Sequence, residues 1–217
     1  MFDYRAQRIN MVESQIRTNK VTDETVLDAF LAVPRERFVP PHLAGIAYVD
    51  EDVPLGGGRY LMEPMVLARL LQLAEIGPRD AVLEIGAATG YATAILSRLA
   101  GRVVAVESDR NLIATARARM QEMQIGNVTL LEGPLDEGYP AGAPYEVIVI
   151  KGAIVSIPDA VGRQLAEGGR LVTVVKPHAL GHGVVMTRSN GILAERRVFD
   201  AGSMKLPGFE PAPSFVF

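Results

Sequence analysis

The segment from Ala81 to Glu107 limits the possible folds of this chain more strongly than any other part of it. It contains an apolar run, a group of small residues, an amphipathic stretch and a second apolar run, at 81–85, 86–90, 91–99 and 103–106. This order predicts a buried strand, a tight turn, a helix and a second strand, the first half of a nucleotide-binding α/β unit. Gly86 and Gly90 permit the sharp turn and leave room for a ligand where a Cβ would intrude.

Glu107 ends the second predicted strand, 21 positions after Gly86. An acid at this place in such folds accepts hydrogen bonds from the hydroxyls of a ribose. The spacing Glu84-x-Gly86-x-Ala88-x-Gly90 resembles the Glu-x-Gly-x-Gly-x-Gly pattern of S-adenosylmethionine-dependent methyltransferases, with Ala88 at the middle glycine. The sequence therefore favours S-adenosylmethionine over a dinucleotide, and a glycine turn that only packs a helix on a sheet is the non-functional alternative.

Composition excludes several other classes of protein. The 217 residues suit one domain, and a net charge of -3 gives no electrostatic footprint for nucleic acid. Without cysteine there is no disulfide, thiolate metal site or cysteine nucleophile. The first residues do not form a basic and then apolar leader, and no apolar run reaches the ~20 residues of a membrane span. We therefore expect a cytoplasmic protein with neither a membrane nor a nucleic acid as partner.

Two histidines have the spacing of helical metal ligands. His178 and His182 are four residues apart, but Pro177, Gly181 and Gly183 disfavour a helix there. We predict that both are loop residues and that the protein has no metal site.

The N-terminal part, residues 1–64, is expected to be a helical extension with an acceptor-site loop, packed on a cofactor-binding domain of residues 65–217. Residues 5–33 predict two helices, the second capped by Thr22 or Asp23. Residues 35–41 are expected to be extended because proline disfavours the helical region for the residue before it. The three glycines at 56–58 predict a turn or a mobile loop that lies over the carboxyl ends of the strands.

The remainder of the chain alternates strand and helix signals. Strands are predicted at 128–131, 145–150 and 170–175, and helices at 64–73, 111–123 and 158–165. A hairpin is predicted at 183–199 with its turn at Asn190-Gly191. The pattern is typical of a doubly wound, Rossmann-like, seven-stranded α/β methyltransferase sheet with a terminal antiparallel hairpin. The apolar tail from Leu206 is expected to pack on the domain, with a dimer contact as the alternative.

Motifs along most of the chain carry a family resemblance: Val33 to Pro40, Pro54 to Gly56, Val82 to Gly86, Ile157-Pro158 and Gly168 to Val172. With these motifs the chain resembles the protein-L-isoaspartate O-methyltransferase family. The resemblance implies methyl transfer from S-adenosylmethionine to the side-chain carboxylate of isoaspartyl residues, which begins protein repair and leaves S-adenosylhomocysteine. The partner would be a peptide or protein that bears isoaspartate, and the oligomeric state stays open.

The resemblance also implies site residues. Those expected at the cofactor are Glu84, Gly86, Ala87, Ala88, Gly90, Tyr91, Glu107, Ser108, Gly133, Pro134 and Leu135. Those expected at the acceptor are Arg59, Tyr60, Leu61 and Glu63, with Met62 at the position of the family's catalytic-site hydroxyl. Lys151 is expected near the methionine end of the cofactor and the acceptor, either binding an anionic group or lying on the surface.

The chain departs from the family pattern at the acceptor and the adenine. Met62 has no hydroxyl, and Gly133-Pro134-Leu135 offers no side-chain acceptor where the family has an aspartate, which leaves backbone and apolar contacts or Glu132. Glu63 would repel a carboxylate about 4 Å away by ~4 kcal/mol at an effective dielectric of about 20, unless it faces solvent or Arg59 offsets it. Two alternatives therefore stay open: a methyltransferase with another acceptor, and a non-catalytic module that binds the cofactor.

Overall fold

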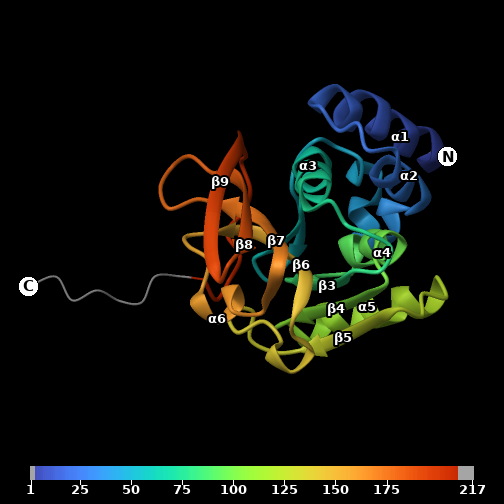
Figure 1. The fold of residues 1–217 in the computed structure, drawn as a ribbon. Coiled ribbons are helices and arrows are strands. Elements are labelled where there is room, and N and C mark those ends of the chain that lie inside the picture. Colours follow the sequence, from blue (N-terminus) through green and yellow to red (C-terminus); the bar gives the residue numbers. More distant parts are fainter. Residues whose placement is uncertain (1–2, 210–217) are drawn as a thin grey trace, which may run out of the picture.

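The computed structural model describes residues 3–209, and a seven-stranded sheet forms its centre (Figure 1). The sheet has the order β5-β4-β3-β6-β7-β8-β9. The strands β5, β4, β3, β6 and β7 are parallel to one another, β8 is antiparallel to β7, and β9 is antiparallel to β8. Its strands are β3 Ala81–Ile85, β4 Arg102–Glu107, β5 Val128–Glu132, β6 Tyr145–Ile154, β7 Leu165–Val175, β8 His182–Ser189 and β9 Ile192–Asp200. The predicted doubly wound sheet and its terminal hairpin are confirmed, with Asn190 and Gly191 at positive φ in the turn.

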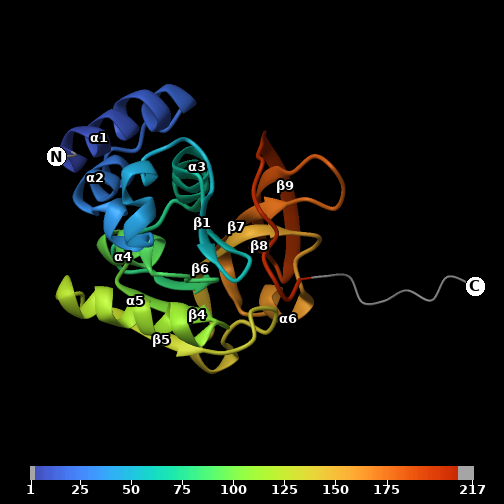
Figure 2. The same ribbon diagram turned by 180° about the vertical axis from the view of Figure 1, so that it is seen from behind.

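Helices cover one face of the sheet more densely than the other (Figures 1 and 2). The α-helices are α1 Tyr4–Asn10, α2 Glu24–Ala32, α3 Pro64–Ala74, α4 Tyr91–Leu99, α5 Arg110–Glu122 and α6 Asp159–Gly162. The helices α1 to α5 lie on one side of the sheet, where one hydrophobic core joins the N-terminal region to α3, α4 and the strands. On the other side, α6 and residues 206–209 pack in a second core. Since that first core joins residues from both sides of position 64, the two predicted parts are packed together, and the boundary itself stays a prediction.

The N-terminal layer contains two continuous helical regions, as predicted. α1 continues into a π-helical stretch, Met11–Ile16, and a 3-10 turn, Arg17–Asn19. The side chain of Asp23, not Thr22, caps α2 by accepting hydrogen bonds from the N–H groups of Thr25 and Val26. Phe30 of α2 packs edge-on against Tyr91 of α4 and so fixes this layer on the sheet domain.

The extended conformation predicted for residues 35–41 is wrong. Two 3-10 helices occupy this region, Arg35–Phe38 and Pro41–Ile46, with Val39 extended between them and Val33 and Pro34 extended before them. Proline restricts only the residue immediately before it, here Val39, which leaves the other four of the five residues between Pro34 and Pro40 free to turn. The turn buries Arg35 completely, where its Nε and Nη2 donate to the carbonyls of Ala47 and Met62 at 2.6 and 2.8 Å.

Two other predicted elements are corrected. The helix predicted at 158–165 is shorter than expected and consists of α6, Asp159–Gly162. It ends early because β7 begins at Leu165, which pairs with Tyr145 of β6. His182 is not a loop residue: it opens β8, and its Nδ1 lies 3.0 Å from Oδ1 of Asp200 on β9.

The three glycines at 56–58 form the turn of a hairpin between β1 Val53–Gly56 and β2 Arg59–Leu61. All three have positive φ, which explains why the turn needs glycine. A Cβ added to Gly57 would lie 3.5 Å from Oδ2 of Asp109, so the hairpin reaches across the end of β4, as predicted for this segment.

The segment Ser203–Leu206, called here the strap, runs beside the end of β6. Its carbonyl at Met204 accepts from the N–H of Ala153, and the N–H of Leu206 donates to the carbonyl of Ala153, both at 2.9 Å. Leu206 and Phe209 are buried, which confirms packing of the tail as far as residue 209; the rest of the predicted tail lies outside the described residues. Within residues 3–209, no helix has the length and apolar character needed to cross a membrane.

Candidate cofactor and acceptor site

Strand alternation places two acids on the same face of the sheet. Glu84 shares its side of β3 with Val82, and Glu107 shares its side of β4 with Val103, all on the face that α4 covers. Both carboxylates are fully buried. Since a buried carboxylate must be paired or hydrogen-bonded, the groups around these two acids define the chemistry of the crevice.

The glycine-rich turn at 86–90 has the backbone that its sequence predicts. Gly86 and Gly90 have φ values of 87° and 91°, and Ala88 takes a left-handed φ of 50°. That conformation costs an alanine about 1 kcal/mol, which is the consequence of replacing the middle glycine of the pattern. The N–H of Ala88 is thereby directed at Glu107 and donates to its Oε2 at 2.6 Å.

Glu107 is the centre of this turn and of the strand end. Its Oε1 accepts from the N–H groups of Ser108 and Asp109 at 2.9 and 3.1 Å. The same oxygen also accepts from Nη1 of Arg59, which is 5% exposed and comes from β2. The acid predicted to bind a ribose is thus in place, and an arginine of this chain is bound to it.

Lys151 makes a second ion pair in the crevice. Its Nζ lies 3.0 Å from Oε1 of Glu84 and donates to the carbonyl of Ala87 at 3.1 Å. The other oxygen of Glu84 accepts from Oγ1 of Thr93 at 2.5 Å. With its side chain 7% exposed, Lys151 is not a surface lysine, and its charge neutralises an acid of the glycine-rich motif.

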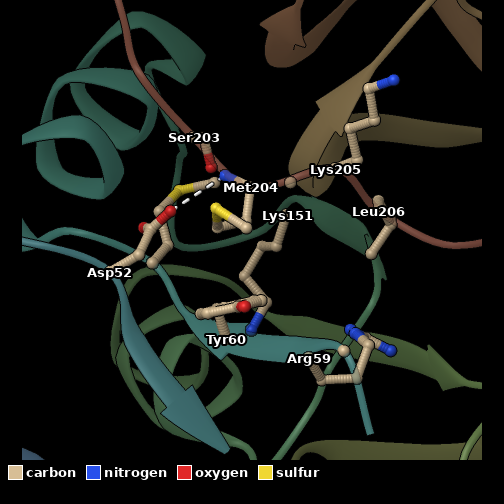
Figure 3. Close-up of a pocket in the computed structure, with 11 residues that line it drawn as sticks. Asp52, Arg59, Tyr60, Lys151, Ser203, Met204, Lys205 and Leu206 are labelled. Atoms are coloured by element: carbon tan, nitrogen blue, oxygen red, sulfur yellow. Dashed lines mark hydrogen bonds between the residues drawn. The ribbon is translucent and has the colours of Figure 1, made fainter.

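The space above Gly86 is filled by side chains. A Cβ added there would lie 3.0 Å from Cδ1 of Leu206 and 3.1 Å from Nη2 of Arg59. Figure 3 shows Arg59, Lys151 and Leu206 around a cavity of only about 20 Å³. That volume holds about one water molecule.

The residues of the turn fit S-adenosylmethionine in type and position. Gly86 presents a surface without a Cβ, and Glu107 lies at the strand end where an acid meets a ribose. The groups nearest to that place are side chains from the hairpin and the strap, and the backbone carbonyl of Lys151 on β6 follows at 3.4 Å. The turn and Glu107 therefore fit the cofactor, whereas side chains of the hairpin and the strap occupy the space that the cofactor would need.

The residues predicted for adenine and ribose are only partly brought together. Ser108 reaches Glu107 through its N–H, and the N–H of Gly133 donates to the carbonyl of Glu107 at 3.1 Å, so both lie at this end of the sheet. Pro134 is exposed, while Leu135 is buried in the second core. The ring of Tyr91 instead packs in the N-terminal layer, with the guanidinium carbon of Arg35 4.8 Å from its centroid.

The acceptor residues divide between core and crevice. Leu61 and Met62 are buried in the first core, and Met62 also lines the small cavity. Tyr60 lines the same cavity (Figure 3). Glu63 is half-buried and does not pair with Arg59, which is bound to Glu107. Burial, followed by the charges of Asp50, Asp52 and Glu51, raises the pKa of Glu63 to about 7, and Arg35 opposes this increase.

Sequence reasoning missed Asp52 and the strap. Asp52 accepts from the N–H of Glu63 through Oδ1 and from the N–H of Met204 through Oδ2, at 2.8 and 2.9 Å. The only advance signal was the apolar character of the tail. Among the residues that the structure describes, no cluster of three or more His, Cys, Asp or Glu side chains is suited to a metal ion.

Comparison with known proteins places these features in a family. The chain is 34% identical to a protein-L-isoaspartate O-methyltransferase of Koribacter versatilis over 212 residues, 96% of each chain. It is 42% identical to one of Protochlamydia amoebophila over 167 residues, 77% of this chain and 80% of the relative. Both relatives carry the name protein-L-isoaspartate O-methyltransferase.

Solved structures agree on the fold. A protein-L-isoaspartate O-methyltransferase superposes with a TM-score of 0.79 at 24% identity, over 95% of this chain and 67% of the other. A Plasmodium falciparum protein described as a putative member, in complex with S-adenosyl-L-homocysteine, gives 0.77 at 16% identity over 96% and 100%. The family model for protein-L-isoaspartate(D-aspartate) O-methyltransferase matches residues 6–200, and the chain belongs to this family.

Proposed function

We propose that this protein transfers a methyl group from S-adenosylmethionine to the side-chain carboxylate of isoaspartyl residues in peptides and proteins. The observation that carries the proposal is Glu107, held at the end of β4 by the N–H of Ala88 in the glycine-rich turn. Family membership and the names of the relatives support the same activity. The product would enter the repair of damaged proteins.

The cofactor-binding residues follow from the crevice. Glu107 would accept from the ribose hydroxyls, the turn at 86–90 would lie against the ligand, and residues 133–135 with Ser108 would border the adenine. Glu84 would act through Lys151, to which it is bound. When bound, S-adenosylmethionine supplies a methyl group on a positively charged sulfur.

The chain needs no general base for this chemistry. A carboxylate with an ordinary pKa of about 4 is already ionised at pH 7. The protein must instead align the acceptor oxygen and remove water from it. Tyr60 and Met62 border the cavity where such an acceptor would lie, and these two side chains would exclude water from it.

Methyl transfer to an isoaspartyl peptide and to its normal aspartyl twin tests the proposal, at saturating S-adenosylmethionine. We expect transfer to the isoaspartyl form alone. Equal transfer to both peptides, or to neither while S-adenosylhomocysteine still binds, would contradict the isoaspartate assignment.

A second candidate is a methyltransferase of this fold with another acceptor. It is favoured by the acidic neighbourhood of Glu63, where burial and then the charges of Asp50, Asp52 and Glu51 raise the pKa of the carboxyl group. Such a neighbourhood opposes an approaching carboxylate and favours a neutral or cationic acceptor. A panel of amine, hydroxyl and carboxylate acceptors, assayed with the same labelled cofactor, separates the two candidates.

Two further expectations belong to the proposal. A protein or peptide partner follows from the proposed reaction, whereas a net charge of -3 supports the expectation of no nucleic-acid partner. The cytoplasmic location also stays a proposal.

A further inference from the structure

The cofactor crevice contains groups that occupy a ligand's place. The guanidinium of Arg59 is bound to Glu107, and the side chain of Leu206 lies against Gly86. Both residues are buried, at 5% and 3% exposure, so neither is a surface side chain that happens to reach the crevice. They come from the two elements that cover it, the β1–β2 hairpin and the strap.

We propose that Arg59 and Leu206 form an internal plug in the free protein, and that cofactor binding expels both and releases the strap from β6. The inference rests on the proposed function, because it concerns the cofactor of that reaction. The plug makes the closed protein unable to bind, so that only the fraction with an open crevice is competent.

Arg59 and a ribose compete for the same carboxylate. Oε1 of Glu107 already accepts from two backbone N–H groups besides the arginine, and Oε2 accepts from Ala88. Glu107 is fully buried, and the side-chain groups bonded to it are the guanidinium of Arg59 and the hydroxyl of Ser108, so a ribose hydroxyl that binds the carboxylate must displace one of them. In the proposed plug, the ion pair with Arg59 is the one that opens.

We expect Leu206 and the hairpin to move together because Asp52 is hydrogen-bonded to both the strap and the hairpin. The strap is held by the two hydrogen bonds with Ala153 and by the N–H of Met204, which donates to Asp52 at the start of the hairpin. Asp52 also accepts from the N–H of Glu63, at the far end of the hairpin. Movement of Leu206 away from Gly86 pulls on the same carboxylate that orients the hairpin carrying Arg59.

The strap itself is built to separate from the sheet. Ser203 and Leu206 face inward, whereas Met204 and Lys205 are exposed, and Figure 3 shows the Lys205 side chain pointing away from the cavity. Only one isolated parallel bridge, Ala153 to Lys205, joins it to β6. A short segment with few backbone hydrogen bonds opens at low cost compared with a strand of the sheet.

Calorimetric titration of the full chain with S-adenosylhomocysteine, which carries no transferable methyl group, tests the plug. A ligand's apparent Kd is its intrinsic Kd divided by the competent fraction, so a variant that empties the crevice binds more tightly. We expect Leu206→Ala and Arg59→Gln each to lower the Kd at least about tenfold.

Two variants outside the crevice serve as matched controls. Leu180→Ala shortens an exposed leucine on the loop before β8, and Arg17→Gln breaks an exposed ion pair with Glu24. We expect the Kd of both to stay within about twofold of the unaltered protein, since surface pairs contribute little. Leu206→Ala also guards against misfolding of Arg59→Gln, because it leaves the buried Glu107 ion pair intact.

Hydrogen exchange gives a readout that tighter packing alone cannot produce. Ligand binding usually slows exchange near a site, whereas the plug predicts faster exchange of the amides of Ala153, Met204 and Leu206 when S-adenosylhomocysteine binds. The turn at 86–90 should show the opposite change. Peptides covering residues 150–155 and 203–206 report the two ends of these hydrogen bonds separately.

Each result has a defined meaning. Tighter binding by both variants together with faster strap exchange supports the plug. Weaker binding by Arg59→Gln, or slower strap exchange in the complex, overturns it and makes Arg59 a ligand of the cofactor, while the proposed function stands. If neither the unaltered protein nor Leu206→Ala binds S-adenosylhomocysteine, the proposed function fails as well.

Discussion

The floor and the cover of the crevice differ in how the chain builds them. The floor, consisting of the turn at 86–90 with Glu84 and Glu107, is made by consecutive strands and by hydrogen bonds close in the sequence. The cover, consisting of the β1–β2 hairpin and the strap, is held by contacts between distant segments, such as Asp52 with Met204 across 152 positions. In our proposal the floor binds the cofactor, and the cover decides whether a ligand reaches it.

A substitution of Lys151 tests whether this residue belongs to the floor or to the cover. Like Arg59 it is a cation paired with a buried acid, but it lies on a central strand of the sheet. Lys151→Met leaves the buried Glu84 without its ion-pair partner, which we expect to cost about 3 kcal/mol of unfolding free energy. Urea denaturation measures this loss. If the variant keeps its stability and binds S-adenosylhomocysteine more tightly, Lys151 belongs to the plug instead.

Glu107→Gln tests the floor directly. The amide keeps the shape of the side chain but loses the charge that ribose hydroxyls and Arg59 both use. We expect roughly 100-fold weaker binding of S-adenosylhomocysteine, about 2.7 kcal/mol, in the range of hydrogen bonds to a charged group.

A double variant sharpens the same comparison. Arg59→Gln should tighten binding in the unaltered protein, but it should have almost no effect when Glu107→Gln is already present, because the ion pair no longer exists. Calorimetry on the four proteins of this cycle gives the coupling. Full additivity of the two changes would show that Arg59 acts at another place.

Gly86→Ala tests whether the floor accepts any side chain. The added Cβ meets Leu206 and Arg59 at close distance and requires a positive φ, which costs about 1–2 kcal/mol. We expect a lower Tm and binding about tenfold weaker. Gly126→Ala is the matched control, since a Cβ there has open space around it; equal effects of the two changes would contradict a role for the space above Gly86.

Glu63→Gln gives the smallest expected effect and depends on pH. The folded protein raises the pKa of Glu63 from 4.5 to about 7, so the carboxyl group lowers stability as pH rises from 4.5 to 7 and does not do so below 4.5. We therefore expect Glu63→Gln to raise Tm by roughly 2–4 °C at pH 8, about 1 kcal/mol after solvent screening, and to leave Tm unchanged near pH 4.

Glu122→Gln is the control for this Tm measurement, because the folded protein shifts the pKa of Glu122 in the opposite direction. Arg119, followed by Arg37, lowers the pKa of this exposed carboxyl group, so its ionised form is the favoured one. We expect no increase in Tm at pH 8. A similar increase for both variants would mean that removing any negative charge stabilises this acidic protein.

The sequence predicted the floor because its signals are local. Strand, turn, helix and acid lie within residues 81–107, and alternation along β3 and β4 decides which way Glu84 and Glu107 point. The glycines of the hairpin turn and the Asn190-Gly191 turn were predictable for the same reason, since positive φ selects residue type.

The cover was not predictable because its residues meet through tertiary contacts. Nothing near Arg59 in the sequence indicates that it bonds to Glu107 instead of offsetting Glu63, and nothing near Asp52 indicates Met204. The error at residues 35–41 has a similar origin: the burial of Arg35 against two carbonyls selects a turn that local proline rules left undecided.

The exposed Lys205 in the strap is a potential protease cleavage site, and its accessibility depends on whether the strap is bound to β6. Proteases require a locally extended, released backbone, and the peptide bond after Lys205 is held against β6 through its neighbours Met204 and Leu206. A trypsin-like protease should therefore cut the strap more readily in the ligand-bound protein than in the free one. Occupancy of a buried crevice would then be visible as a nick in the polypeptide at the surface.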